Sequence, residues 1–290
     1  MVSDPVSLRS LERGDDLVVA SVYEREIGAS LERVWENVYD WAHLPYLHSE
    51  AFNTIERLDS GVWGWHARIG IGGSDREAKG KAEIELELVT DKTDQCYVSR
   101  TLVGPGAPSE IWTHLDPVAD DRTAIRVEFC VSPVPQEALE RIGKGFVSLY
   151  TLLWDQDEVM MQTREAALAR PRPVESRGEE STRVSLGSLD SLRRELPLTV
   201  DFDGRTFRVV EVDGELVAHA TECPHLLGPL GETEIEDGKI LCPWHGYAFD
   251  VRNGRSCDGR GLSLAKPPEI EIAAGSRNVE LHAPGRGSRE

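Results

Sequence analysis

Four residues, arranged as two short pairs, constrain this chain more than any other feature of its sequence. Cys223 and His225 form a C-x-H pair, and Cys242 and His245 form a C-x2-H pair after sixteen intervening residues. Each pair lies beside proline and glycine, which favour stiff turns at the tips of hairpins. Two thiolates and two imidazoles on facing loops suit a [2Fe–2S] cluster with sulfur ligands on one iron and nitrogen ligands on the other. The spacing therefore predicts a redox protein.

The same four residues could instead be two buried structural thiols with two incidental histidines, or the ligands of a single zinc ion. Zinc sites usually contain C-x2-C pairs, and this sequence has none. In a chain with 5 cysteines and 8 histidines, a chance match at these positions is expected roughly once in ten thousand chains. The spacing therefore favours the cluster.

The stretch from about Val184 to His282 resembles the Rieske domain, both in these four residues and in the segment Gly246–Gly254 that follows the second pair. Gly228 and Trp244 stand where the respiratory type has an extra disulfide pair. The resemblance is therefore to the ferredoxin and oxygenase type. It implies a modest reduction potential, suited to passing electrons to an oxygenase centre.

A change of composition divides the chain into two predicted domains. Residues 169–182 are polar, contain two prolines and lack apolar periodicity, which is typical of an exposed linker. We expect one domain over residues 1–168, a second over 183–283 and a short tail at 284–290. In the second domain, short strands separated by Asp203-Gly204 and Asp213-Gly214 predict an all-β module.

The first domain has a different pattern, in which strands precede one long helix. The pattern predicts a strand near 17–26 and then helix from Ser30. Apolar alternation predicts further strands near 52–58, 62–69, 82–89, 95–102, 110–115 and 124–131. After Pro135, apolar residues recur at steps of three, four and seven, which predicts a long amphipathic helix. This order resembles the helix-grip fold of the START and Bet v 1 (SRPBCC) superfamily. We therefore expect an α+β protein, with a helix-grip domain followed by an all-β Rieske domain.

The catalytic domain of Rieske oxygenases has the helix-grip fold, which implies a second iron site. The segment from Glu36 to His48 has the spacing E-x3-D-x2-H-x4-H and matches that family's mononuclear iron motif, with His43 and His48 as ligands. On an unbroken helix the two histidines would point about 140° apart, so we expect Pro45 to break or kink the helix between them. Asp40 is expected to accept the ring N–H of His43. Alternatively these residues reflect only the fold, since metal-free helix-grip proteins often carry Trp, Asp and Pro here.

Non-haem iron of this kind takes two histidines and one carboxylate. Asp157 lies between Leu153 and Met160 on the apolar face of the long helix, where a polar side chain is costly without a partner. Asp155 and Glu158 lie off the centre of that face. The surrounding segment also resembles the one that brings the carboxylate in Rieske oxygenases. We therefore expect Asp157 to be the third ligand; the alternative is a surface acid on a solvated face.

Taken together, these features resemble a Rieske non-haem iron mono- or dioxygenase. Electrons would enter at the [2Fe–2S] cluster and pass to a mononuclear Fe(II), where O2 is activated beside a small hydrophobic or aromatic substrate. In that family the residue equivalent to Asp40 bridges a cluster histidine and an iron histidine, commonly across a subunit interface in a trimer. His225 or His245 would be its partner, and a homo-oligomer is expected. The sequence has no flavin or nicotinamide motif, so a separate reductase or ferredoxin is the expected electron donor.

The order of the domains departs from the family pattern. The usual chain begins with the Rieske domain, whereas here that domain comes last and the first domain is short. A linker of about fourteen residues reaches at most roughly 45 Å, so electron routes within a chain and between subunits both remain open. The alternative function is a non-catalytic Rieske electron carrier fused to a START-like domain that binds a hydrophobic ligand.

Composition bears on the compartment of the protein and on the partners that it is expected to lack. A net charge of -19 would repel the phosphates of a nucleic acid. The N-terminus lacks the features of a signal peptide, and no run of 18 apolar residues occurs. Cys96, Cys130 and Cys257 are irregularly spaced, which is typical of reduced thiols rather than a disulfide framework. We therefore expect a cytoplasmic protein with no nucleic-acid or membrane partner.

Overall fold

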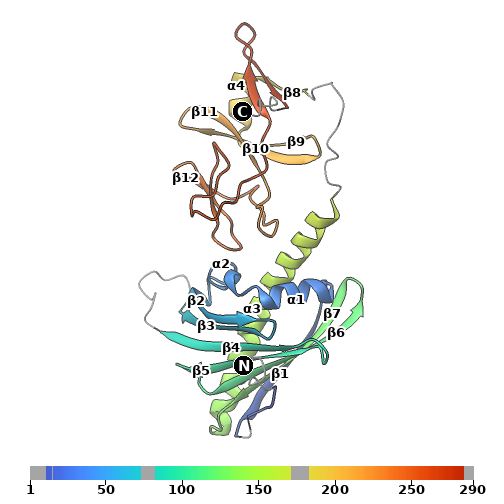
Figure 1. Cartoon of the computed structure of the whole chain (residues 1–290), viewed down its shortest axis with the longest axis vertical. Helices are drawn as coiled ribbons and strands as arrows, with labels where there is room; N and C mark the ends of the chain where they lie inside the picture. Colours follow the sequence, from blue (N-terminus) through green and yellow to red (C-terminus); the bar gives the residue numbers. More distant parts are fainter. Residues whose placement is uncertain (1–10, 15, 73–81, 171–182, 284–290) are drawn as a thin grey trace, which may run out of the picture. The chain divides into compact units, whose positions relative to one another are not determined.

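The fold is known from a computed structural model, which describes residues 11–14, 16–72, 82–170 and 183–283. The chain divides into two compact units, Met1–Gln162 and Thr163–Glu290 (Figure 1). From residue 171 onward, the predicted linker lies outside the described residues, and so does the predicted tail at 284–290. Among the described residues, no helix combines the length and the apolar character that a membrane span requires.

The N-terminal unit is built on one antiparallel sheet of seven strands in the order β1-β7-β6-β5-β4-β3-β2. Neighbouring strands from β2 to β7 are consecutive in the chain, and β1 returns to pair with β7. The sequence pattern predicted each of these strands. Their bounds are β1 Val18–Ile27, β2 Phe52–Gly61, β3 Gly64–Ile71, β4 Glu83–Asp91, β5 Cys96–Val103, β6 Ser109–Ala119 and β7 Arg122–Val131.

One face of this sheet forms the main core of the unit. In the β3–β4 pair, Trp65 lies opposite Leu88 and Ile69 lies opposite Ile84, and all four side chains are buried. His66 lies between the two pairs and faces the other side, because side chains alternate along a strand. The alternation in the sequence therefore sets which face of the sheet is covered.

Helix α1 (Leu31–Tyr39) packs against this apolar face. It begins at Ser30, whose hydroxyl accepts a hydrogen bond from the backbone N–H of Arg33, as expected of an N-cap residue. In the core, the indole N–H of Trp65 donates to the carbonyl of Val38 at 2.9 Å. That bond fixes the end of α1 on the sheet, just before the segment that carries the predicted iron ligands.

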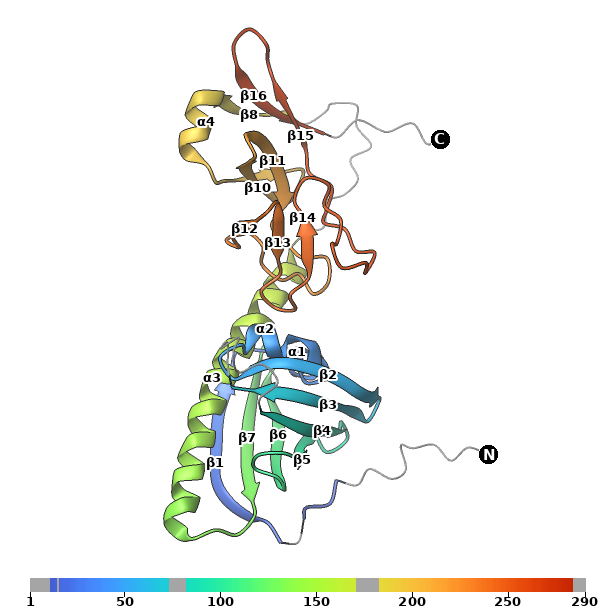
Figure 2. The same ribbon diagram turned by 90° about the vertical axis from the view of Figure 1, so that its left-hand side faces the viewer.

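Helix α3 (Gln136–Ala169) follows Pro135, as predicted, and runs beside β1 and β7 (Figure 2). The ring of Phe146 stacks on Phe129 of β7, with centroids 4.8 Å apart. Gly143 approaches β1 closely, and Ser21 Oγ donates to its carbonyl at 3.0 Å. These contacts hold α3 along the sheet and set which of its residues face the interior.

After α3, the described residues of the C-terminal unit form three small sheets and one short helix. The all-β prediction missed this helix, α4, which begins after Ser188, whose hydroxyl accepts from the N–H of Ser191. The strands of the first sheet are β9 Leu198–Phe202, β10 Arg205–Val212 and β11 Glu215–Ala220. The others are β12 Ile235–Glu236, β13 Lys239–Leu241 and β14 Ala248–Asp250, and then β8 Arg183–Ser188, β15 Glu269–Ile272 and β16 Asn278–His282; α4 is Leu189–Glu195.

Two tight turns shape the sheet that precedes the cluster residues. Asp203 and Gly204 have φ values of 48° and 71°, and Asp213 and Gly214 have φ values of 53° and 82°. Positive φ at both central residues is the geometry of a two-residue hairpin turn, for which Asp-Gly is well suited. The predicted hairpins are therefore confirmed.

Candidate metal centres

The first cluster pair lies on a tight loop that follows β11. The backbone N–H of Cys223 donates to the carbonyl of Gly228 at 2.8 Å, and the N–H of Leu227 donates back to Cys223 at 3.0 Å. Leu227 has a φ of 63°, the left-handed conformation that glycine usually supplies. These two hydrogen bonds hold Cys223 and His225 on one rigid turn.

The second pair lies on a loop with the same hydrogen-bond pattern, between β13 and β14. The N–H of Cys242 donates to the carbonyl of Tyr247 at 2.9 Å, and the N–H of Gly246 donates back to Cys242 at 2.8 Å. Gly246 has a φ of 64° and takes the place that Leu227 has in the first loop. Two loops with the same backbone hydrogen bonds therefore each present one cysteine and one histidine.

The four side chains lie together, sorted by donor type. Cys223 and Cys242 are fully buried, and their sulfur atoms contact each other. The rings of His225 and His245 have centroids 4.5 Å apart and stand nearly perpendicular, at 89°. Two sulfurs on one side and two imidazoles on the other are the donors that a cluster with one sulfur-ligated and one nitrogen-ligated iron requires. The residues present therefore fit a [2Fe–2S] group.

The two thiols also favour metal binding electrostatically. The hydrogen bond between them lowers the pKa of Cys242, and the same contact, with burial, raises the pKa of Cys223. One proton therefore leaves the pair readily. Because the thiolate is the form that binds iron, this contact prepares the site for a metal.

Gly228 allows the two loops to approach each other. A Cβ atom at this position would lie 2.8 Å from Cys242 Sγ and 3.1 Å from the ring of Trp244. Any side chain would therefore push the second loop away. At the positions where the respiratory type has a disulfide, a glycine and a tryptophan here pack directly against each other.

An aromatic side chain that the sequence pattern did not single out covers the histidine pair. The ring of Tyr247 lies 4.6 Å from that of His225 and 5.8 Å from that of His245. The guanidinium of Arg260 stacks on Tyr247, with Cζ 3.9 Å from the ring centroid. Arg260 itself pairs with Asp258, Nε to Oδ2 at 2.7 Å. A stacked cation thus holds the tyrosine against the histidines.

The second predicted centre lies in the N-terminal unit. His43 ends the short 3-10 helix η2 (Trp41–His43), His48 caps α2 (Leu44–Leu47), and Asp157 comes from the middle of α3. All three side chains are buried, and one potential ligand atom from each lies within 4.8 Å of the other two. Nε2 of His48 is 3.1 Å from Oδ1 of Asp157, and Nε2 of His43 is 3.5 Å from the same oxygen.

The helix break that brings the two histidines together differs from the one predicted. Helix α1 ends before Asp40, whose φ of -86° and ψ of 74° are not helical. Pro45 lies in the first turn of α2, where a proline is tolerated because that N–H has no helical partner. His48 then leaves the helix at its C-terminal end, with a ψ of 38°. The prediction that Pro45 breaks the helix between the histidines was therefore wrong, although their ring centroids lie 5.1 Å apart.

The spacing of the three donors fits a metal ion. Nitrogen and oxygen ligands lie about 2.0–2.2 Å from a first-row metal, so neighbouring ligands at right angles or tetrahedral angles are separated by about 3.0–3.5 Å. The two distances from Asp157 fall in this range. Nδ1 of His43 is buried without a hydrogen bond, and its nearest carboxylate oxygen, on Asp40, is 3.6 Å away. That separation is too long for the predicted hydrogen bond from His43 to Asp40.

Two neighbouring side chains that the sequence pattern did not assign hold the ligands in place. Nδ1 of His48 lies 2.7 Å from Oε1 of Gln156, and Asn37 Nδ2 donates to Asp157 Oδ1 at 2.9 Å. With its amide oxygen toward the ring, Gln156 accepts a hydrogen bond from Nδ1 of His48, so Nε2 is the nitrogen that faces the centre. Only the structure shows these contacts, because each joins residues far apart in the chain.

Burial and the neighbouring charges shift the pKa values of His48 and Asp157 in opposite directions. Burial lowers the pKa of His48, but the charge of Asp157 and hydrogen bonds from Asp157 and Gln156 outweigh it, so the pKa is raised. Burial raises the pKa of Asp157, and the nearby His48 and His43, together with Asn37, bring it below its usual value. Without a metal, the pair therefore favours a charged carboxylate on Asp157 beside a protonated imidazole on His48.

The other two acids of this helix segment have different partners. Asp155 and Glu158 both bind Arg25 of β1, and the Asp155 contact measures 2.6 Å. Only Asp157 faces the interior, where it lines a cavity of about 120 Å³. Aromatic and aliphatic side chains form most of its walls, among them Trp65, Trp154, Tyr97, Tyr150, Leu88 and Leu153.

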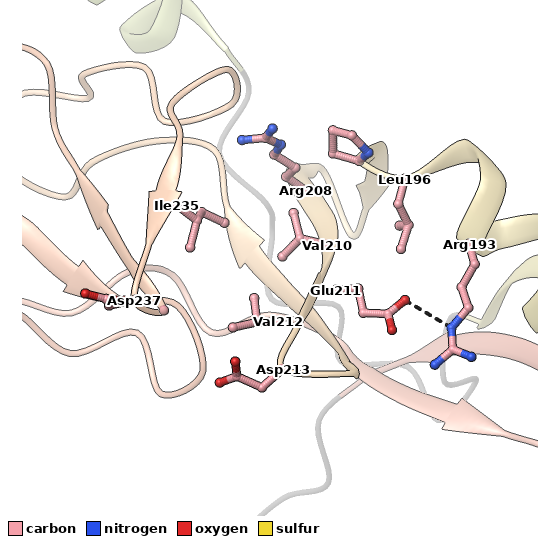
Figure 3. Close-up of a pocket in the computed structure, with 11 residues that line it drawn as sticks. Arg193, Leu196, Arg208, Val210, Glu211, Val212, Asp213, Ile235 and Asp237 are labelled. Atoms are coloured by element: carbon pink, nitrogen blue, oxygen red, sulfur yellow. Dashed lines mark ion pairs between the residues drawn. The ribbon is translucent and has the colours of Figure 1, made fainter.

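A separate groove lies in the C-terminal unit over β10 and has a volume of about 560 Å³ (Figure 3). Arg193 Nε pairs with Glu211 Oε2 at 3.0 Å, and Arg208 donates to the carbonyl of Thr233 at 2.7 Å. Both arginines are thus held by protein acceptors. None of the four cluster residues lines this groove.

Among the comparisons with known proteins, a family model matches part of the C-terminal unit. That model is described as "Rieske [2Fe-2S] domain" and matches residues 182–266. Human apoptosis-inducing factor 3 is 26% identical over 108 residues, which are 37% of this chain and 18% of that protein. The mouse protein is 33% identical over 64 residues, 22% of this chain and 11% of its own length. The chain therefore spans less than a fifth of the length of these relatives.

Solved structures resemble each unit separately. The Zhui aromatase/cyclase from Streptomyces sp. R1128 covers 53% of this chain and 98% of its own, with 12% identity and a TM-score of 0.42. The ferredoxin of carbazole 1,9a-dioxygenase from Nocardioides aromaticivorans IC177 covers 36% of this chain and 99% of its own, with 26% identity and a TM-score of 0.30. Given the family match and the sorted donors of its two loops, the C-terminal part of this chain is a Rieske [2Fe–2S] domain, the domain of an electron carrier.

Proposed function

We propose that this chain is the oxygenase component of a Rieske non-haem iron system. In this proposal, the [2Fe–2S] cluster is bound by Cys223, His225, Cys242 and His245, and a mononuclear Fe(II) by His43, His48 and Asp157. Iron at the second centre would supply the position at which O2 is reduced. The observation that carries the proposal is the convergence of two buried imidazoles and one buried carboxylate on a cavity, in a chain that also has a Rieske domain.

The chain's own residues have defined parts in this proposal. Gln156 accepts a hydrogen bond from Nδ1 of His48 and so directs Nε2 toward the metal. Asn37 fixes the carboxylate of Asp157. The walls are mostly apolar, and an apolar surrounding strengthens electrostatic interactions within the centre. Two histidines and one carboxylate leave coordination positions open for O2 and substrate.

Electron delivery is also part of the proposal. Asp40 would connect His43 to His225 or His245, within a chain or across a subunit interface of a trimer. A separate reductase or ferredoxin would reduce the cluster. The substrate would be a small hydrophobic or aromatic molecule in the cavity.

Nitric oxide, used in place of O2, tests the proposal. The iron-loaded, reduced protein is exposed to nitric oxide, and the EPR signal of a non-haem Fe(II)–nitric oxide adduct is measured. We expect the signal in the wild type and in His114→Ala, whose exposed side chain lies outside the centre, and we expect it to be lost in His43→Ala and Asp157→Ala. A wild type without the signal would contradict an open iron site.

A second function is favoured by the short contact between His48 and Asp157. At 3.1 Å this contact is also a hydrogen bond between imidazole and carboxylate, which is stable without a metal. The chain would then be a Rieske electron carrier fused to a domain that binds a hydrophobic ligand. That function predicts no nitric oxide adduct, and unchanged cluster spectra in the His43 and Asp157 variants.

A further inference from the structure

The cavity beside Asp157 limits the size of any ligand. Its volume is about 120 Å³. For comparison, an apolar protein cavity of about 150 Å³ holds one benzene molecule. Rigid aromatic walls, including Trp65 and Trp154, leave little freedom to expand. The space is therefore about the size of one ring, and we expect two fused rings to be too large for it.

The charge of the walls limits the ligand further. No lysine or arginine is among the described residues that line the cavity, and its carboxylates are those of Asp40 and Asp157. These two negative charges would balance a divalent iron. An anionic ligand that does not bind the metal would meet these two carboxylates and no lysine or arginine, so the desolvation of its charge is repaid poorly. The cavity therefore selects against carboxylates.

Three wall residues carry hydroxyl groups, namely Tyr97, Ser99 and Tyr150, and the smallest of them is Ser99. Ser99 of β5 is 8% exposed, lines the cavity, and lies opposite Leu88 on the neighbouring strand. Its hydroxyl makes no hydrogen bond with any residue in the described part of the chain. Pockets for small molecules typically orient their ligand through a few polar groups of this kind. Ser99 is therefore placed to bind a polar group of the ligand.

We propose that this cavity binds a neutral molecule the size of a single ring, which carries one hydroxyl or carbonyl group that hydrogen bonds to Ser99. The inference rests on the proposed function, because this molecule would be the substrate of the oxygenase. The binding itself does not require iron, so the two can be tested apart.

Phenol and toluene, which differ by a hydroxyl in place of a methyl group, test the polar contact. Their binding can be followed by tryptophan fluorescence, because every tryptophan except Trp244 belongs to the N-terminal unit. We expect Ser99→Ala to weaken phenol binding by about three- to tenfold, the value of one neutral hydrogen bond, and to leave toluene binding unchanged. Equal effects on both compounds, or none on phenol, would overturn the role of Ser99.

The charge rule is tested on chelator-treated protein at about pH 8.5, where neither iron nor a charged His48 can bind an anion. The ligands are isobutyramide and isobutyrate, which have the same shape and differ in charge. We expect isobutyrate to bind at least about tenfold more weakly, in competition with phenol. Equal binding of the two would overturn the rule.

The size rule is tested with 2-naphthol. The wild type should not bind it, and Leu153→Ala, which widens the cavity wall, should. Leu168→Ala is the matched control, because Leu168 is exposed on the same helix. Binding of 2-naphthol to the wild type would contradict the size limit.

The other titrations are run on iron-loaded protein and on protein treated with a chelator. If the nitric oxide signal is absent but phenol binds through Ser99, the oxygenase proposal fails and the ligand rule stands. If the signal is present but isobutyrate binds as well as isobutyramide, the ligand rule fails and the oxygenase proposal stands.

Discussion

Nε2 of His48 and Oδ1 of Asp157 lie 3.1 Å apart, although one residue caps a helix early in the N-terminal unit and the other lies in its last helix. Gln156, next to Asp157, binds the other nitrogen of the same ring at 2.7 Å. Two consecutive residues of α3 therefore clamp one imidazole from both sides. The position of α3 in the fold therefore sets the orientation of the His48 ring in the centre.

Replacing Gln156 tests the clamp. In Gln156→Leu, Nδ1 of His48 loses its acceptor, so the ring is no longer held with Nε2 toward the centre. We expect affinity for a divalent metal such as Co(II) to fall by about 10- to 100-fold. Gln156→Glu keeps the acceptor and should retain tight binding, and Gln162→Leu, exposed on the same helix, should have no effect. Unchanged Co(II) affinity in Gln156→Leu would show that the contact does not position the ligand.

The pair also makes the stability of the metal-free protein depend on pH. The pKa of His48 is raised above 6.5, so its stabilisation is complete below that pH and is lost as the pH rises through the raised value. The pKa of Asp157 is lowered below 3.8, so its stabilisation is complete above that pH and is lost as the pH falls through the lowered value. The pair therefore stabilises the unit most between about pH 4 and 6.5.

Thermal unfolding of chelator-treated protein, followed by tryptophan fluorescence, measures this dependence. His48→Gln should lower the Tm more at about pH 5.5 than at about pH 8.5, because the wild-type imidazole loses its charge at the higher pH. A Tm difference that is the same at both pH values would mean that the imidazole and carboxylate are not coupled.

Two glycines of α3 test how closely this helix approaches the sheet. A Cβ on Gly143 would lie 2.5 Å from the carbonyl oxygen of Ala20, whereas a Cβ on Gly145 would meet nothing within 4 Å. We expect Gly143→Ala to reduce the free energy of unfolding by roughly 1–3 kcal/mol, because α3 must shift away from β1. Gly145→Ala should increase it by roughly 0.5–1 kcal/mol, the usual gain in a helix. Denaturant unfolding measures both, and equal effects would contradict the close approach.

Gly228 is the corresponding test for the cluster loops. In Gly228→Ala the new methyl group would lie 2.8 Å from Cys242 Sγ. We expect most of the visible absorption of the [2Fe–2S] cluster to be lost, because the second loop is displaced. In Gly231→Ala, the matched control, the nearest atoms are at 3.6 Å, an ordinary contact distance, so the cluster should be retained. A fully loaded Gly228→Ala protein would show that the loops can separate without losing the cluster.

The local sequence pattern predicted much of this fold, because the spacing of apolar residues determines which side chains a strand or helix can bury. This pattern placed the strands of the N-terminal unit, and the Asp-Gly turns placed the hairpins of the C-terminal unit. Helix α4 was missed because its seven residues are too few to show a clear period, although Ser188 is a good N-cap. Asp157 was identifiable because an acid interrupts an apolar stripe.

The partners of the predicted ligands could not be found in the same way. Gln156 and Asn37 look like ordinary polar residues of a helix, and each gains its role from a residue that is distant in the chain. Pro45 was given the wrong role, because the non-helical backbone at Asp40 leaves no mark in the sequence pattern. Tertiary contacts, not local preference, decide these features.

The iron content of the wild-type protein, purified and loaded with iron without oxygen, tests the central claim most directly. A Rieske cluster and a mononuclear centre together predict three irons per chain. His43→Ala and Asp157→Ala should each lose one of them, while the visible absorption of the cluster stays the same. Two irons per wild-type chain, unchanged in both variants, would contradict the account.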